Sequence, residues 1–156
     1  MAKEIERKYI VKNNEWKQCE LLKKVNIKQG YIVKAIQHQF RVRLIDDEAT
    51  LTIKGPRKGL ARDEFEYDIP YEDGQQLMKM AVLPVISKTR YYVRDPIHQV
   101  WEVDIYKGKN KGLVVAEIEL EDARQVVRAP KWIGREVTHD KRYTNTYLAE
   151  HKVPRR

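Results

Sequence analysis

Hydrophobic and polar residues alternate with a period of two along most of the 156-residue chain. This alternation is typical of β-strands with one polar and one apolar face, whereas a helix repeats every 3.6 residues. Clusters of Gly, Pro, Asp and Asn interrupt the alternation and predict the turns between strands. The predicted strands are residues 3–11, 27–35, 38–46, 48–55, 62–69, 84–94, 98–106 and 113–121.

Four short segments depart from the alternation and predict helices. They are residues 14–24, 71–81, 121–128 and 143–151. Together with eight strands, these helices predict an α+β chain that is mainly antiparallel β, built as a barrel or a sandwich. No linker of low complexity interrupts the chain, so we expect one domain over residues 1–156.

The polar faces of the predicted strands carry charges that are sorted by sign. Residues i and i+2 of a strand share one face, and six such pairs are like-charged. They are Glu4/Glu6, Arg41/Arg43, Glu64/Glu66, Lys88/Arg90, Glu102/Asp104 and Glu117/Glu119. An antiparallel sheet with one wet face is the ordinary explanation of polar and apolar alternation, but a solvated face usually mixes both signs.

Coulomb repulsion distinguishes an open sheet from a closed one. At about 7 Å, two like charges repel by roughly 0.6 kcal/mol in water and by roughly 2.4 kcal/mol at an effective dielectric of ~20. Six enclosed pairs would cost on the order of 14 kcal/mol before compensation, which is comparable to the ~5–15 kcal/mol stability of a domain. Neighbouring strands of opposite sign and bound ions would offset this repulsion. We therefore expect a closed barrel whose charged lumen binds divalent metal and phosphate.

Composition narrows the class of protein. The net charge of +8 at pH 7 indicates an anionic partner. No apolar run approaches the ~20 residues of a membrane span, and the N-terminal segment lacks the apolar region of a secretory signal. The single cysteine, Cys19, fits a reducing compartment. We therefore expect a cytoplasmic protein with no membrane partner.

Ordered sequence blocks along the chain resemble the CYTH superfamily, the triphosphate tunnel metalloenzymes. The first is EIERKYIV, which holds Glu4-x-Glu6-x-Lys8. The others are QGYI (29–32), FRVRL (40–44), LTIKG (51–55), RDEFEYDI (62–69), KTRYY (88–92), WEVDIY (101–106), VVAEIEL (114–120) and EVTHDKRYTN (136–145). The resemblance implies an eight-stranded closed β-barrel with short helices outside it and a C-terminal helix near one mouth. Such a tunnel would hold a linear triphosphate and Mg²⁺ or Mn²⁺.

The resemblance also implies a role for each charged position of the tunnel. The residues implied to bind metal are Glu4, Glu6 and Glu119, with Glu117 and Asp104 near that ion or a second one. The residues implied to bind phosphate are Lys8, Arg41, Arg43, Lys54, Lys88 and Arg90. The catalytic candidates are Lys88, Arg90, Glu117 and Glu119.

Five further positions match the family pattern less specifically. Glu64, Glu66 and Glu102 match tunnel acids whose role stays open between a second metal, water positioning and orientation of the basic residues. Tyr31 matches a tyrosine that covers the tunnel mouth. Arg142 belongs to the C-terminal stretch that closes one end, from which it would reach the substrate.

The expected activity is hydrolysis of the terminal phosphoanhydride of inorganic tripolyphosphate. A class IV adenylyl cyclase, a thiamine triphosphatase and a non-catalytic polyphosphate- or nucleotide-binding module stay open as alternatives. A nucleic-acid-binding barrel would place aromatic residues among its charges. Here Phe40, Phe65, Tyr67 and Trp101 fall on the opposite faces, so we expect no nucleic acid partner. A homodimer is left open.

Overall fold

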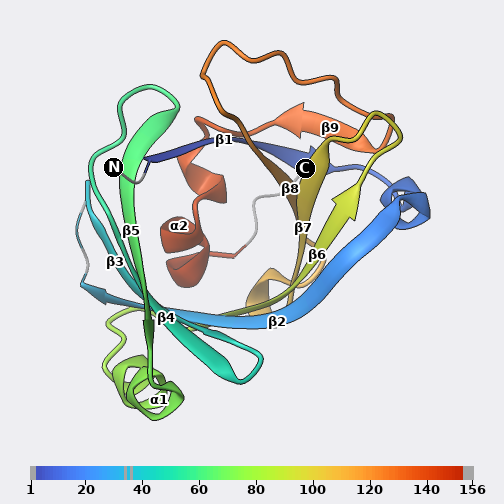
Figure 1. The fold of residues 1–156 in the computed structure, drawn as a ribbon. Coiled ribbons are helices and arrows are strands. Elements are labelled where there is room, and N and C mark those ends of the chain that lie inside the picture. The colour runs from blue at the N-terminus through green and yellow to red at the C-terminus, as the bar shows by residue number, and fades with distance from the viewer. Residues whose placement is uncertain (1–2, 34, 36, 153–156) are drawn as a thin grey trace.

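The computed structural model describes residues 3–33, 35 and 37–152, and its main feature is a ring of eight antiparallel strands (Figure 1). The strands of the ring are β1 (Lys3–Val11), β2 (Glu20–Val33), β3 (Gln39–Ile45), β4 (Glu48–Lys54), β5 (Ala61–Ile69), β6 (Ile86–Arg94), β7 (Val100–Tyr106) and β8 (Val114–Glu119). Their order is β5-β4-β3-β2-β6-β7-β8-β1, and pairing between β1 and β5 closes the ring. The predicted eight-stranded closed barrel is therefore confirmed.

The first strand makes the closure possible because it pairs along both of its edges. One edge pairs with β8 from Glu6 to Ile10. The other edge pairs first with β5, where Glu4 lies opposite Arg62, and then with a ninth strand, β9 (Ile133–Glu136). The sequence did not predict β9, because four residues are too few to show an alternation.

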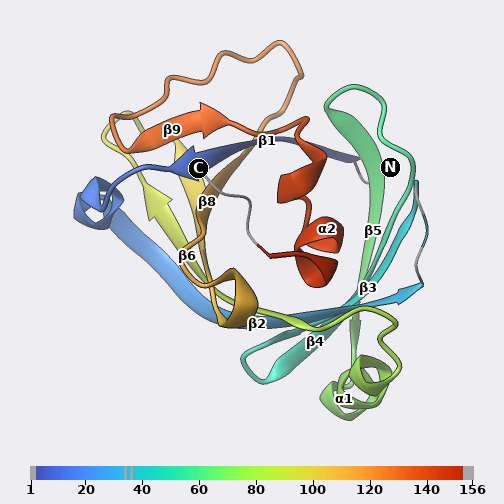
Figure 2. The same cartoon turned by 180° about the vertical axis from the view of Figure 1, so that it is seen from behind.

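Two α-helices lie on different sides of the barrel wall (Figures 1 and 2). Helix α1 (Tyr71–Lys79) packs outside against β3 and β4. Gly74 allows this contact, since a Cβ there would lie 2.5 Å from the Cβ of Ala49. Helix α2 (Asn145–Glu150) lies within the outline of the ring. This placement confirms the expected C-terminal helix near one mouth.

Two of the predicted helices are wrong. In place of a helix over residues 14–24 there is only one 3₁₀ turn, η1 (Glu15–Gln18), and β2 already begins at Glu20. The first residues of β2 pair with the end of β6, and tertiary pairing overrides their helical propensity. The segment 121–128 holds no helix: residues 121–124 form a bend and a turn, and residues 125–128 have no regular structure. The Asp122 side chain accepts hydrogen bonds from Arg124 and so competes with helix formation.

Apolar side chains form two clusters, and neither fills the middle of the barrel. The outer cluster packs against β1, β6, β7 and β8 and includes Trp16, Trp101 and Trp132. The rings of Trp101 and Trp132 meet edge to face, with their centroids 5.4 Å apart. The second cluster packs α2 against one end of the barrel and includes Tyr31, Tyr106, Tyr143 and Leu148. The rest of the lumen is left to polar side chains.

Two further short 3₁₀ turns are η2 (Gly108–Asn110) and η3 (Lys141–Tyr143). Within the described part of the chain, no helix has the length and apolar composition needed to cross a bilayer.

Candidate active site

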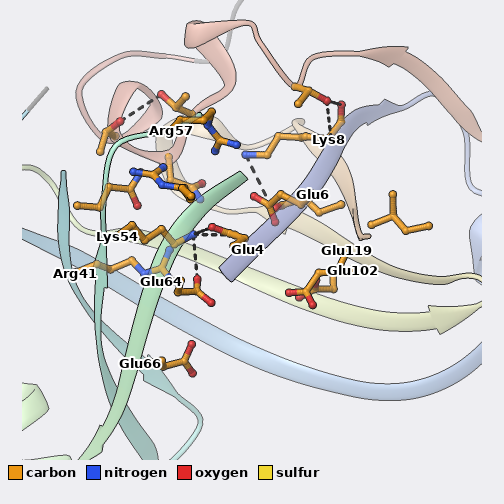
Figure 3. A pocket seen from close by; sticks show the side chains of 18 of the residues that line it. Glu4, Glu6, Lys8, Arg41, Lys54, Arg57, Glu64, Glu66, Glu102 and Glu119 are labelled. Atoms are coloured by element: carbon orange, nitrogen blue, oxygen red, sulfur yellow. Dashed lines mark hydrogen bonds and ion pairs between the residues drawn. The ribbon is translucent and has the colours of Figure 1, made fainter. Parts of the chain in front are cut away.

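The polar faces of the strands line one cavity of about 1150 Å³ inside the barrel. The predicted site residues that line it are Glu4, Glu6, Lys8, Arg41, Arg43, Lys54, Glu64, Glu66, Arg90, Glu102, Glu117 and Glu119. Figure 3 shows the side chains of many of these residues around the cavity. The alternation of the strands thus directs the sorted charges inward.

Register brings the acidic residues of three neighbouring strands together. Glu6 on β1 lies opposite Glu119 on β8, and Glu117 on β8 lies opposite both Lys8 on β1 and Glu102 on β7. The strand order of the ring places β3, with its two inward arginines, opposite β8. The cavity therefore has an acidic side and a basic side that face each other.

Lys54 bridges two carboxylates on the acidic side. Its ammonium nitrogen lies 2.8 Å from an oxygen of Glu4 and 3.4 Å from an oxygen of Glu64 (Figure 3). Burial alone would raise the pKa of Glu4, but the charge and hydrogen bond of Lys54 bring that pKa below its usual value. Glu4 is therefore held as an anion.

Glu6 and Glu117 form a crowded carboxylate pair. Burial, and after it the charges of Glu117 and Glu4, raises the pKa of Glu6 well above its usual value. Burial also acts to raise the pKa of Glu117, but Lys8 and Arg90 outweigh it and bring that pKa well below its usual value. Two carboxylates that share one site favour a single shared proton.

This donor set fits a hard divalent cation. Carboxylate oxygens are the protein ligands that Mg²⁺ and Mn²⁺ favour, and a cation between Glu6 and Glu117 would replace the proton that they share. Within residues 3–33, 35 and 37–152, no three acidic, histidine or cysteine side chains are already gathered around one point. Glu4, Glu64 and Glu117 instead lie within 4 Å of lysine or arginine nitrogens.

A second ionic cluster lies beside the cavity, between β6 and β7. Arg90 donates to both oxygens of Asp104, at 2.7 and 2.9 Å, and to Glu102 at 2.8 Å. Lys88 lies 2.7 Å from Asp104, and both of those side chains are 0% exposed. Burial acts to raise the pKa of Asp104, but Arg90 and Lys88 outweigh it and lower that pKa. Burial raises the pKa of Glu102 to about 7.

Four predicted site residues do not line the cavity. Lys88 and Asp104 are buried in the ionic cluster of β6 and β7 and do not reach the cavity surface. Tyr31 is buried in the apolar cluster at the end where α2 packs. Arg142 is half-exposed and pairs with Asp140 at 2.6 Å, and Asp140 rather than Arg142 reaches the cavity.

The C-terminal segment closes part of one end of the barrel. Asn110 donates to the backbone oxygen of Leu148 at 2.8 Å, and Lys109 donates to that of Ala149. Lys8 donates from the lumen to the backbone oxygen of Tyr143 at 3.2 Å. These contacts hold the segment in place and connect it to a predicted phosphate-binding lysine.

Several residues of the lumen could not be assigned to it from the charge pattern of the sequence. Arg57 and Arg62 line the cavity, although the basic loop between Lys54 and Arg62 resembles ordinary solvated charge. The alternation could have revealed Arg62, because it shares the inward face of β5 with Glu64. Gln29 also lies on an inward face, with 0% exposure, and the pattern of charges gave no signal for it because it is neutral.

Known proteins are similar to this chain in sequence and in fold. The CYTH domain model matches residues 2–155. An inorganic triphosphatase of Acetivibrio thermocellus is 44% identical over 151 residues, which are 96% of this chain and 95% of the relative. An inorganic triphosphatase of Nitrosomonas europaea is 36% identical over 149 residues, which are 94% of this chain and 96% of the relative.

The likeness extends to three dimensions. The crystal structure of an inorganic triphosphatase, 33% identical to this chain, matches it with a TM-score of 0.71 over 97% of each chain. The match therefore covers the barrel and the strands that carry the charged lumen. The family model, the two sequence relatives and this fold agree, and the chain belongs to the CYTH domain family.

Proposed function

We propose that this chain hydrolyses the terminal phosphoanhydride bond of inorganic tripolyphosphate inside the barrel, with Mg²⁺ or Mn²⁺ as cofactor. The observation that carries the proposal is the closed lumen in which a basic side faces a crowded carboxylate side. A linear triphosphate with a divalent cation presents the complementary charges. Relatives at 44% and 36% identity are named inorganic triphosphatases, which supports the same activity.

The phosphate groups would bind to the basic residues that reach the cavity. Those residues are Lys8, Arg41, Arg43, Lys54 and Arg90. A guanidinium can bind two phosphate oxygens at once and so fixes their orientation, whereas an ammonium acts as a point charge. Lys88 would not contact the phosphates directly, since its ammonium group pairs with Asp104 in the buried ionic cluster. It would contribute to the positive potential of the lumen.

The divalent cation would be held by Glu4, Glu6, Glu117 and Glu119. All four line the cavity, and Glu6 and Glu119 lie opposite each other in register. A bound Mg²⁺ or Mn²⁺ supplies positive charge to the phosphate oxygens. We leave Asp104 out of this set, because both of its oxygens already accept hydrogen bonds from Arg90.

Positioning and charge stabilisation would account for most of the catalysis. Phosphoryl transfer passes through a loose transition state, with charge spread over the oxygens of the transferred group. Water attacks the terminal phosphorus, and the bond between that phosphorus and the bridging oxygen breaks. The products are orthophosphate and pyrophosphate. Arg41 and Arg43 would bind oxygens of the substrate from one side of the lumen while the carboxylates hold the cation on the other.

Product analysis tests the proposal. The purified chain is incubated with tripolyphosphate, thiamine triphosphate or ATP, each with Mg²⁺, Mn²⁺ or EDTA. We expect metal-dependent release of orthophosphate, fastest from tripolyphosphate. Cyclic AMP and pyrophosphate from ATP would identify a cyclase instead. Binding of tripolyphosphate without release of orthophosphate under any metal would identify a non-catalytic binding module.

A further inference from the structure

Gln29 holds the side chain of Arg43 in one orientation. The two residues lie opposite each other on β2 and β3. The side-chain oxygen of Gln29 accepts hydrogen bonds from Nε and Nη2 of Arg43, at 3.1 and 2.8 Å. Its side-chain nitrogen donates to the hydroxyl of Tyr31 at 3.3 Å. Because a guanidinium can only donate hydrogen bonds, the carboxamide atom that faces Arg43 must be the oxygen of Gln29 and not its nitrogen.

The partner of Arg43 is neutral, and this distinguishes it from Arg90. Arg90 meets Asp104 at 2.7 Å and Glu102 at 2.8 Å, so two carboxylates compensate its charge. In the described part of the chain, Arg43 forms no ion pair. Burial, followed by the charges of Arg41 and Arg90, lowers the pKa of Arg43 to about 10, although the charge of Asp104, with which Arg43 forms no ion pair, acts in the opposite direction. Arg43 therefore stays charged at neutral pH.

Arg41 adds a second uncompensated guanidinium beside Arg43. It is the neighbouring inward residue of β3 and is buried. Its Nε is buried and has no hydrogen-bond partner among the described residues. A buried charged donor without a partner is unfavourable unless a ligand binds to it. The inward face of β3 therefore holds two cations that are free to bind an anion.

A glutamine orients an arginine without cancelling its charge. A carboxylate at position 29 could accept the same two hydrogen bonds, but it would neutralise the guanidinium and weaken its attraction for phosphate. We propose that Gln29 is a positioning residue that orients Arg43 toward the substrate phosphates while leaving its charge uncompensated. The inference rests on the proposed function, since it specifies how the same cavity binds a linear triphosphate.

The substitution Gln29→Glu tests this inference directly. Binding of tripolyphosphate is measured by calorimetry in EDTA, where neither metal nor turnover contributes. We expect affinity to fall by at least about tenfold, because a carboxylate would compete with phosphate for Arg43. The melting temperature should not fall, since the introduced carboxylate would form an ion pair with Arg43. With metal, we expect KM for tripolyphosphate to rise in parallel.

Two further variants separate orientation from charge. Gln29→Met retains volume but removes the acceptor, so Arg43 stays charged and loses its orientation, and we expect a loss of affinity of about threefold. Gln39→Glu is the matched control, since Gln39 lines the same cavity on β3 but lies opposite Lys54 rather than Arg43. One more carboxylate there should weaken binding by less than about threefold.

The order of affinities decides the inference. Wild type, Gln29→Met and Gln29→Glu should bind tripolyphosphate with decreasing affinity. Binding by Gln29→Glu that is no weaker than that of Gln39→Glu would overturn it. If Gln29→Glu does not fold, Gln29→Met decides alone, and wild-type affinity in that variant would overturn the inference. Failure of the wild type to release orthophosphate would instead contradict the proposed function, while the order of affinities would still test Gln29.

Discussion

Two walls of the lumen carry the same kind of inward basic pair but in opposite electrostatic states. On β6, Lys88 and Arg90 are compensated by Asp104 and Glu102, with contacts of 2.7 to 2.8 Å. On β3, Arg43 is oriented by an uncharged partner and a buried nitrogen of Arg41 has no partner among the described residues. The β6 wall therefore holds its positive charge in ion pairs, whereas the positive charge of the β3 wall forms no ion pair among the described residues and can attract an anion. Two inward cations on a strand do not by themselves indicate which of these roles they have.

The largest expected effect is on the compensated wall. Asp104→Asn removes the carboxylate that Lys88 and Arg90 share, so two buried cations lose their main partner. Breaking a buried ion pair from one side costs about 3–5 kcal/mol, which corresponds to a fall of roughly 10 °C in melting temperature for a domain of this size. Thermal unfolding measures this loss, and an unchanged melting temperature would contradict the structural role of the β6 wall.

The substitution Arg43→Ala should show the opposite behaviour on the β3 wall. We expect kcat/KM for tripolyphosphate to fall by about 100-fold, the usual loss when one charge-stabilising donor is removed. The free energy of unfolding should fall by less than in Asp104→Asn, by about 1–3 kcal/mol, because no ion pair is broken and only the buried oxygen of Gln29 loses its donors. Arg43→Lys is the matched control, since lysine keeps the charge but cannot form a bidentate contact with phosphate. For this variant we expect kcat/KM to fall about tenfold. A large loss of stability in Arg43→Ala would remove the difference between the walls.

The pH dependence of stability provides a smaller test of the β6 wall. Burial raises the pKa of Glu102 to about 7, so the folded chain binds this proton more tightly than the unfolded chain does. The associated stability is present below the ordinary pKa of 4.5 and is lost as pH rises to about 7. In metal-free buffer, Glu102→Gln should therefore lose less stability than wild type between these pH values. An identical pH profile in the two proteins would contradict the raised pKa.

The smallest effect is expected outside the lumen. Arg142 does not line the cavity, and its guanidinium pairs with Asp140 near the surface. Exposed ion pairs contribute about 0–1 kcal/mol, so Arg142→Ala should change kcat/KM by less than about threefold. A loss as large as that of Arg43→Ala would show that Arg142 reaches the substrate, as the family resemblance implied.

The sequence predicts which residues face the lumen better than it predicts what they contact. Alternation assigns Arg41, Arg43 and Arg90 to inward faces, and like-charged neighbours on one strand indicate a closed barrel. Contacts between strands depend on register, which no single strand encodes. For that reason the pairing of Arg90 with Asp104 was not predictable. Gln29 was missed as well, because a pattern based on charge overlooks an uncharged acceptor.

The fold shows the same division between local and tertiary causes. The strands and α1 follow from local alternation and periodicity, with bounds that shift by a few residues. The extension of β2 back to Glu20 was not predictable, since its exposed first residues become a strand only through pairing with β6. The segment 121–128 contains helix-forming residues, yet it holds no helix, and the hydrogen bonds of Asp122 compete with helix formation there.

Release of orthophosphate from tripolyphosphate, compared between wild type and Glu119→Gln, tests the central claim most directly. We expect metal-dependent release by the wild type. In the variant, turnover should fall by about 100-fold or more at an unchanged melting temperature, because a carboxamide is a poor ligand for a hard cation. Turnover near the wild-type rate would exclude Glu119 from the metal site. No release by the wild type with either Mg²⁺ or Mn²⁺ would contradict the hydrolytic function itself.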